Sequence, residues 1–248
     1  AALLCSSMVL SLVSTPVSAA ETGQLTNPPT STEGPGSPES ASGNEAAAVL
    51  NGLSVSALTA NRVAEVTTAE HLTDMLADSS VVKITLAENI DIDSTLTVNR
   101  TVTLDLDGNV LKMTGSGSVI KVESGGNLTI ADSNPSTPHK FTPGGDGLWR
   151  LDETGGSKIV YGGIITGGNT PNGGGVYVVT SGQLTMTGGN IVGCQATYEG
   201  GGVYIDGLRG SSDQTVFTMT GGSITGCQAN GTDGGGGVNV TKGTFTMK

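Results

Sequence analysis

Four aspartates stand in two pairs whose members are separated by a single residue: Asp91 with Asp93, and Asp105 with Asp107. Carboxylates grouped in this way can bind calcium, or can act as acid and base in the hydrolysis of a glycosidic bond. The second pair matches only the start of a calcium-binding loop, because the later ligands of that motif are missing. Its alternation with leucines suits a solvent-facing position on a strand equally well. We therefore predict no catalytic residue, no metal ligand and no cofactor.

The chain contains two histidines, His71 and His139, and no third ligand lies at a metal-binding spacing from either. We expect both to be solvated surface residues. The sequence also contains no nucleophile elbow, no phosphate-binding loop and no metalloprotease motif.

Three cysteines are too few for a fold framed by disulfides. Cys5 belongs to the N-terminal leader, whereas Cys194 and Cys227 occupy equivalent positions of a repeat and should be stacked on neighbouring strands. Neighbouring strands bring Cα atoms within the range that a disulfide tolerates. Free cysteine nevertheless behaves as a small apolar residue. We expect a ladder of buried thiols, with a disulfide as the alternative.

The candidate ligand-binding residues are Tyr177, Tyr204 and Asn239, which stand at the same position of three successive repeats. Aromatic rings exposed on a flat sheet can receive sugar rings or a partner protein. Stacking that only stabilises the sheet explains the two tyrosines equally well. Threonines at residues 185–187 and 218–220 would form a second outward ladder, which is also a feature of ice-binding solenoids, but threonine is simply favoured in strands.

These residues belong to a repeat that fills residues 173–247. Each copy begins with three glycines followed by Val-Tyr-Val, Val-Tyr-Ile or Val-Asn-Val, and the first two copies continue with Thr-Met-Thr-Gly-Gly. Apolar residues recur with a period of two, which is typical of strands, and glycines separate the strands at corners. Stacking the copies would place Leu184, Phe217 and Phe245 above one another at the ~4.8 Å spacing of neighbouring strands.

The Gly-Gly-Gly-Val-Tyr and Thr-Met-Thr-Gly-Gly-x-Ile-x-Gly-Cys runs resemble the glycine-rich repeats of right-handed parallel β-helix proteins on bacterial surfaces. They are similar to the Gly-Gly-Ala-Ile repeats of polymorphic outer-membrane proteins and adhesins, although Cys-Gln-Ala replaces the companion Phe-x-x-Asn motif. The resemblance covers residues 81–248 and is strongest after residue 161. It implies an all-β, pectate-lyase-like solenoid and a location at the cell surface.

A short helix is predicted over residues 67–78, because Thr67 and Glu70 form a capping-box pattern and Leu72, Met75 and Leu76 follow at helical spacing. We expect this helix to cap the interior of the first coil. Alternating apolar residues then predict strands at residues 81–86, 96–98, 102–106, 110–111, 119–122 and 128–130.

Residues 134–146 contain three prolines and are predicted to form a long loop, after which a diverged coil resumes over residues 159–167. In that coil Gly168 takes the position of the repeat cysteine.

We divide the chain into a signal peptide (1–20), a disordered linker rich in Ser, Thr, Pro and Gly (21–60), a cap region (61–79) and a parallel β-helix (80–248). We expect the β-helix to continue beyond the sequence, which stops within a repeat. No segment reaches the ~20 apolar residues that a membrane-spanning helix requires.

The net charge of −11 argues against a nucleic-acid partner, and 40 glycines in 248 residues suit a solenoid better than a large globular core. We expect a secreted or cell-surface, adhesin-like scaffold that contacts host or matrix glycans or proteins. The main alternative is a polysaccharide lyase or hydrolase of the pectate-lyase-like superfamily, with its active coil beside residues 134–146 or beyond the sequence. A purely structural surface stalk is the third possibility.

Overall fold

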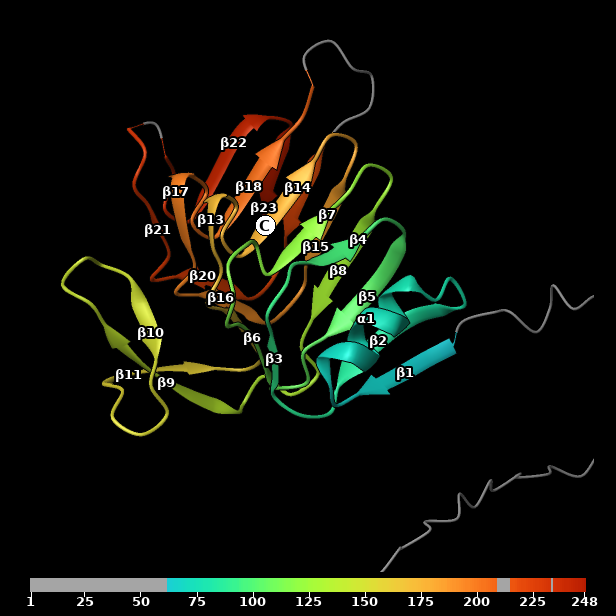
Figure 1. Cartoon of the computed structure of the whole chain (residues 1–248), viewed down its shortest axis with the longest axis horizontal. Coiled ribbons are helices and arrows are strands. Elements are labelled where there is room, and N and C mark those ends of the chain that lie inside the picture. The colour runs from blue at the N-terminus through green and yellow to red at the C-terminus, as the bar shows by residue number, and fades with distance from the viewer. Residues whose placement is uncertain (1–61, 209–214, 233) are drawn as a thin grey trace, which may run out of the picture. The chain divides into compact units, whose positions relative to one another are not determined.

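The computed structural model describes residues 62–208, 215–232 and 234–248. The predicted signal peptide and the predicted linker therefore lie outside the described residues. The described part is mostly β-structure, with one short helix near its start (Figure 1).

Three parallel sheets, which we name A, B and C, are stacked from short strands of successive coils (Figure 1). Sheet A contains β1 (Arg62–Val66), β2 (Val81–Leu86), β5 (Thr101–Asp105), β8 (Asn127–Ala131), β15 (Gln183–Met186), β19 (Val216–Met219) and β23 (Thr244–Met247). Sheet B contains β3 (Ile90–Ile92), β6 (Val110–Met113), β12 (Ile164–Thr166), β16 (Asn190–Val192) and β20 (Ser223–Thr225). Sheet C contains β4 (Leu96–Val98), β7 (Ile120–Val122), β14 (Val176–Val179), β18 (Val203–Asp206) and β22 (Val238–Lys242).

The chain visits sheets A, B and C in turn, so each circuit adds one strand to every sheet. From β12 onward the passage between sheets B and C carries an additional strand. These strands form a short parallel sheet D, made of β13 (Asn169–Asn172), β17 (Gln195–Glu199) and β21 (Gln228–Ala229). The three-strand coil expected from the sequence therefore describes the first two coils, and the later coils have four strands.

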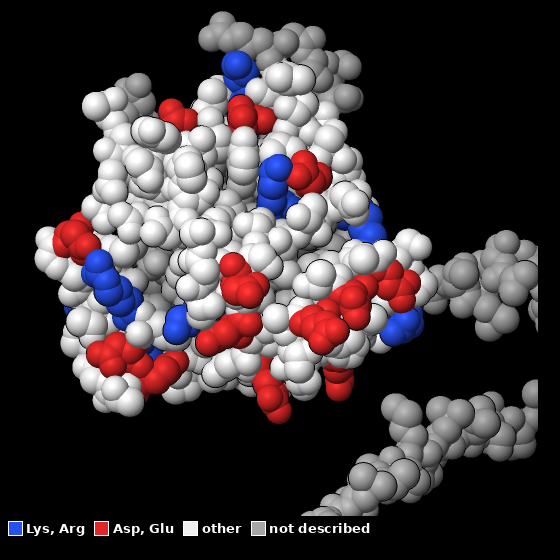
Figure 2. Space-filling model, in the orientation of Figure 1, with Lys and Arg blue, Asp and Glu red and all other residues white. Residues whose placement is uncertain are grey.

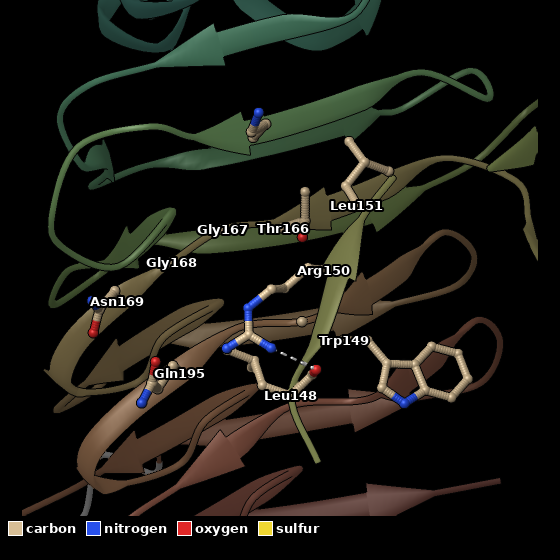
Figure 3. A pocket seen from close by; sticks show the side chains of 11 residues that line it. Leu148, Trp149, Arg150, Leu151, Thr166, Gly167, Gly168, Asn169 and Gln195 are labelled. Carbon is tan, nitrogen blue, oxygen red and sulfur yellow. Dashed lines mark hydrogen bonds between the residues drawn. The ribbon is translucent and has the colours of Figure 1, made fainter. Parts of the chain in front are cut away.

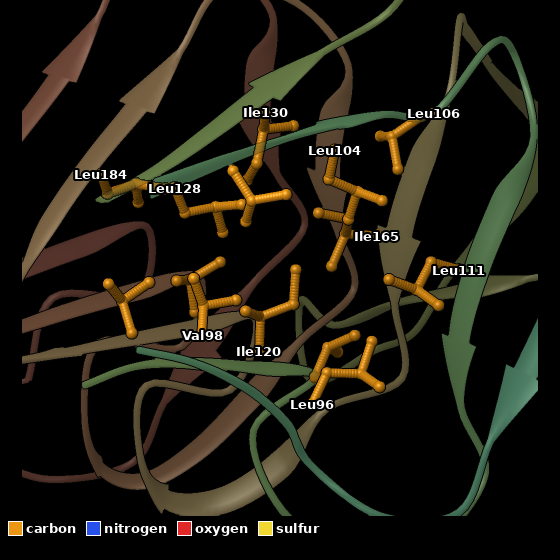
Figure 4. Close-up of a cluster of buried hydrophobic side chains, with 14 of the residues drawn as sticks. Leu96, Val98, Leu104, Leu106, Leu111, Ile120, Leu128, Ile130, Ile165 and Leu184 are labelled. Carbon is orange, nitrogen blue, oxygen red and sulfur yellow. The ribbon is translucent and has the colours of Figure 1, made fainter. Parts of the chain in front are cut away.

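Like side chains stack inside the coils, as the repeat predicts. Leu184 pairs with Phe217, and Phe217 pairs with Phe245. The rings of Phe217 and Phe245 stack with their centroids 4.8 Å apart. Figure 4 shows the same stacking earlier in sheet A, where Leu128 lies beside Leu184. Because each buried apolar side chain contributes about 1.5–3 kcal/mol, these ladders are the main source of stability.

The glycine triplets lie at a corner where neighbouring coils are in backbone contact. The amide of Gly175 donates a 2.9 Å hydrogen bond to the carbonyl of Gly202 in the next coil. A Cβ atom at Gly175 would lie 2.5 Å from a methyl carbon of Ile191 and 2.6 Å from the carbonyl oxygen of Gly202. Any larger residue would therefore push the coils apart at this corner.

Helix α1 (Ala69–Ala77) lies between β1 and β2 and packs on β2, β3 and β4. Its buried residues, Leu72 and Leu76, join the core of the solenoid. The guanidinium of Arg100 donates to the carbonyls of Leu76 and Met75 at 2.8 and 2.7 Å, which satisfies the C-terminal end of the helix.

The N-cap of this helix is Thr68, whose hydroxyl oxygen accepts a 3.2 Å hydrogen bond from the His71 amide. The predicted capping box built on Thr67 is therefore wrong by one residue. Strand β1 was not predicted, although Ala64 and Val66 show the alternating burial of a strand. Within the described residues, no helix is long and apolar enough to cross a membrane.

The predicted long loop over residues 134–146 is wrong in its centre, because Pro138–Pro143 form a strand of an antiparallel sheet. Sheet E contains β9 (Pro138–Pro143), β10 (Trp149–Leu151) and β11 (Lys158–Tyr161), with β9 in the centre, and we call it the insertion. It packs on the outer face of sheet B through a second apolar cluster made of Val110, Phe141, Ile164 and Val192, with Trp149, Leu151 and Val160 at its border. A proline stands at each end of β9, and because proline is uncommon in strands, the sequence did not indicate a strand here.

Candidate functional site

The structure brings Tyr177, Tyr204 and Asn239 together in one ladder on sheet C. Tyr177 pairs with Tyr204, and Tyr204 pairs with Asn239. The two rings lie with their centroids 5.3 Å apart at a tilt of 39°. Lys121 precedes them in the ladder, and its Nζ atom lies 5.8 Å from the centre of the Tyr177 ring. The predicted register is thus confirmed.

Both tyrosines of this ladder are held by neighbours. Tyr204 is only 6% exposed, and its hydroxyl lies 2.9 Å from the Thr241 hydroxyl. Tyr177 donates a 3.0 Å hydrogen bond to Asp206. Burial and this hydrogen bond raise the pKa of Tyr177 to about 12. The ladder therefore offers little open ring surface at Tyr204, and its role in ligand binding stays a prediction.

The aspartates lie at different places on the first coils. Asp91 and Asp93 are exposed at β3, whereas Asp105 is 1% exposed, which corrects the solvent-facing position expected for it. Its carboxylate lies 2.7 Å from Lys83 Nζ and accepts the amide of Ser133 at 2.9 Å. Burial alone would raise the pKa of Asp105, but the hydrogen bonds from Lys83 and Ser133 outweigh burial and hold it below its ordinary value. Asp105 therefore ties adjacent coils together.

In the described ranges, no group of three or more His, Cys, Asp and Glu side chains is arranged to hold a metal ion. The expectation that the protein needs no metal stays a prediction.

The two histidines have different surroundings. His71 is exposed on α1, as expected. His139 is only 5% exposed, so the prediction of a solvated surface residue is wrong. Its Nδ1 atom lies 2.8 Å from Glu153 Oε1, and its Nε2 atom lies 2.8 Å from the carbonyl oxygen of Gly108. The alternation of β9 turns His139 and Phe141 toward the solenoid, and His139 thereby anchors the insertion to the corner after β5.

Cys194 and Cys227 are free thiols on neighbouring coils, as expected. The amide of Cys194 lies 3.5 Å from the sulfur of Cys227. The hydrogen bond with Cys227, followed by burial, raises the pKa of the Cys194 thiol. The pair belongs to the apolar interior and contributes no site on the surface.

A pocket of about 330 Å³ lies beneath β10, where this strand crosses the border between sheets B and D (Figure 3). The amide of Trp149 donates a 2.9 Å hydrogen bond to the carbonyl of Gly226. A Cβ atom at Gly226 would lie 2.2 Å from the Trp149 ring, and one at Gly193 would lie 1.9 Å from the Trp149 carbonyl oxygen. These two glycines allow β10 to lie directly on the coils.

Polar side chains from several strands line this pocket. They are Lys112 of β6, Arg150 of β10, Thr166 of β12, Asn169 of β13 and Gln195 of β17. In Figure 3 the Arg150 guanidinium points toward Asn169 and Gln195, whereas the Trp149 indole lies on the opposite side of β10. Lys112 pairs with Thr166, and Asn169 pairs with Gln195, so adjacent coils fix the spacing of these groups.

Arg150 is held in place by Asp146, which binds both terminal nitrogens of the guanidinium at 3.2 and 2.7 Å. The hydrogen bonds from Arg150 lower the pKa of Asp146 to about 2. Asp146 Oδ1 also accepts the Leu148 amide at 3.1 Å, which fixes the turn before β10. Arg150 thus has a defined orientation although its side chain is 56% exposed.

The two cations of the pocket contrast with an acidic protein surface. The net charge is −11, and acidic side chains gather along the lower edge of the face drawn in Figure 2. Within the described part of the chain, Lys112 forms no ion pair and no side-chain hydrogen bond. Asp91 of β3 is the register neighbour of Lys112 but forms no ion pair with it. A pocket whose lysine has no ion-pair partner within the described residues suits a ligand that carries negative charge.

Sequence reasoning missed this pocket, because its residues come from separate segments and meet only after the insertion has packed on sheet B. Comparison with protein-family models, with curated proteins and with solved structures finds no match to this chain.

Proposed function

We propose that this protein is a secreted or cell-surface, adhesin-like scaffold that contacts glycans of a host or matrix. The observation that carries the proposal is the polar pocket beneath β10, where donors from rigid strands face a common space. Lysine, arginine, threonine and amide side chains provide the hydrogen bonds that sugar hydroxyls require. Strands of a solenoid hold such groups more precisely than loops do.

The handedness of the coils and the role of α1 are part of the same proposal. We take the coils to be right-handed, as in pectate-lyase-like solenoids, because crossovers between parallel strands are almost always right-handed. We assign α1 the role of a cap, since its buried leucines cover apolar side chains at the start of the solenoid. The predicted signal peptide supports export.

A glycan array probed with the purified protein tests the proposed function, with matrix proteins spotted on the same surface. The Arg150→Ala variant should lose signal on the glycans that the unchanged protein binds. The Lys158→Ala variant, which removes an exposed cation outside the pocket, should keep that signal. Failure of the unchanged protein to bind any glycan would contradict the proposal and favour a structural stalk.

The purified protein can also be used to distinguish binding from catalysis. Incubation with the polysaccharides that bind should release no unsaturated and no reducing products. Sustained product release would replace the adhesin-like proposal with a polysaccharide lyase or hydrolase. Labelling of intact cells with an antibody against the solenoid tests the proposed location, and signal only after cell lysis would contradict it.

A further inference from the structure

The chemistry of the pocket beneath β10 indicates which kind of sugar it takes. An arginine side chain has five N–H donors. In the described residues Arg150 uses three of them, two with Asp146 and one with the Leu148 carbonyl at 3.3 Å. The Nε–H group and one terminal N–H group therefore have no partner there. The oriented guanidinium retains donors for a ligand.

Lys112 provides the second positive charge. It lies half-buried on the outer face of sheet B, beside Thr166 in the register. The Thr166 side chain is only 3% exposed, and its hydroxyl makes no hydrogen bond within the described residues. This pair can offer an ammonium group and a hydroxyl group to the same ligand.

Asn169 and Gln195, on adjacent strands of sheet D, line the same pocket with neutral amide groups. An amide both donates and accepts hydrogen bonds, which matches a sugar hydroxyl. A highly charged polyanion would need more cations than this pocket has, and the net charge of −11 would repel it. At about 330 Å³ the pocket is at the small end of ligand sites, which suits a short stretch of glycan.

We propose that the pocket beneath β10 binds a sugar residue carrying a carboxylate or a sulfate, with the charged group between Arg150 and Lys112 and the hydroxyls at Thr166, Asn169 and Gln195. The inference rests on the proposed function and names the class of glycan that the scaffold contacts. Carboxylate and sulfate are both anions that can accept hydrogen bonds from Arg150 and Lys112. The two pairs of oligosaccharides described below distinguish between them.

Asp146 leaves two donors of Arg150 without a partner, but its negative charge lies beside the guanidinium and would repel an anionic ligand. The Asp146→Asn variant keeps an oxygen for the Leu148 amide but removes the negative charge beside the guanidinium. This variant should therefore bind an anionic sugar about 3- to 10-fold more tightly, because like charges at short range oppose binding.

Isothermal titration with two matched pairs of oligosaccharides tests the proposal. One pair is a glucuronate-containing oligosaccharide and its carboxyl-reduced form, and the other is a sulfated oligosaccharide and its desulfated form. The charged member of at least one pair should bind at least about 10-fold more tightly than its neutral form, because charge-assisted hydrogen bonds are lost in the neutral form. The preferred pair identifies carboxylate or sulfate as the recognised group.

Lys112→Gln and Arg150→Gln should each weaken binding of the charged probe by about 10-fold or more. Lys158→Gln, the matched loss of an exposed cation on β11, should change the affinity by less than about twofold. Unchanged circular dichroism and Trp149 emission would show that each variant is folded, and Lys112→Gln leaves the Asp146 contact intact.

Equal affinity for the charged and neutral probes would overturn the inference, as would normal binding by both Lys112→Gln and Arg150→Gln. In those cases the glycan array still decides the proposed function, because neutral glycans can bind there. Absence of binding to every oligosaccharide, on the array and in solution, would overturn both proposals.

Discussion

Replacing His139 with alanine should loosen the insertion from the solenoid without unfolding the stacked sheets. The histidine is 5% exposed and its ring bridges the Gly108 carbonyl and the Glu153 carboxylate at 2.8 Å each. Leaving the Gly108 carbonyl unpaired costs about 1–3 kcal/mol. The contact with Glu153, whose side chain is 45% exposed, adds about 0.2–1 kcal/mol. With the lost packing of the ring, we expect a total of about 2–4 kcal/mol.

Hydrogen exchange of backbone amides measures this loss locally. A loss of about 2–4 kcal/mol corresponds to exchange about 30- to 700-fold faster in β9, β10 and β11. Amides of sheets A and C should keep their protection, because the insertion contacts the outer face of sheet B. His71→Ala is the matched control, since that residue is exposed on α1. A change of less than about threefold in the insertion would refute the reasoning that His139 anchors it.

Four further tests concern the packing of the solenoid, its contact with the insertion and the ladder of sheet C. Phe217→Ala removes a fully buried ring from the stack of sheet A and should lower the free energy of unfolding by about 3–5 kcal/mol in urea titrations. Gly226→Ala would place a Cβ atom 2.2 Å from the ring of Trp149, the only tryptophan of the chain, so the emission spectrum of that residue should shift. Tyr177 should titrate near pH 12 in an ultraviolet titration, and because this pKa is raised from 10.0, its contribution to stability should disappear as the pH rises between these values. Asp206→Asn should lower the pKa of Tyr177 only in part, since burial is the larger cause.

The stacking of the coils could be predicted because equivalent residues of successive repeat copies lie on neighbouring strands. Each of Leu184, Phe217 and Phe245 is followed by Thr-Met in its copy of the repeat, so their register can be inferred once period-two alternation identifies a strand. The diverged coil predicted over residues 159–167 is confirmed in part: Ile165 pairs with Ile191 as the alignment requires, whereas residues 159–161 belong to β11 of the insertion. A repeat thus predicts which distant strands pair with each other, whereas the alternation within one strand does not.

Short strands outside the clear repeats were harder to recognise. Strand β3 was missed although Ile90 and Ile92 alternate with an aspartate just as the apolar residues of 96–98 alternate with a threonine. The predicted capping box was wrong because two threonines in succession, Thr67 and Thr68, both suit an N-cap, and tertiary packing selects the second.

The candidate site could not be predicted, because it depends on how the insertion packs. Lys112, Arg150 and Gln195 lie on three strands of three different sheets. Their proximity requires the antiparallel pairing of β9 with β10 and the contact of Trp149 with Gly226. Neither contact repeats an earlier one, so the sequence contains no second copy from which to infer it.

A crystal structure of the complex with the preferred charged oligosaccharide tests the account most directly. We predict that the sugar lies beneath β10, with its carboxylate or sulfate in contact with Arg150 and Lys112 and its hydroxyls at Asn169 and Gln195. A sugar bound instead along the ladder of Tyr177 and Tyr204, with the pocket beneath β10 empty, would contradict the account.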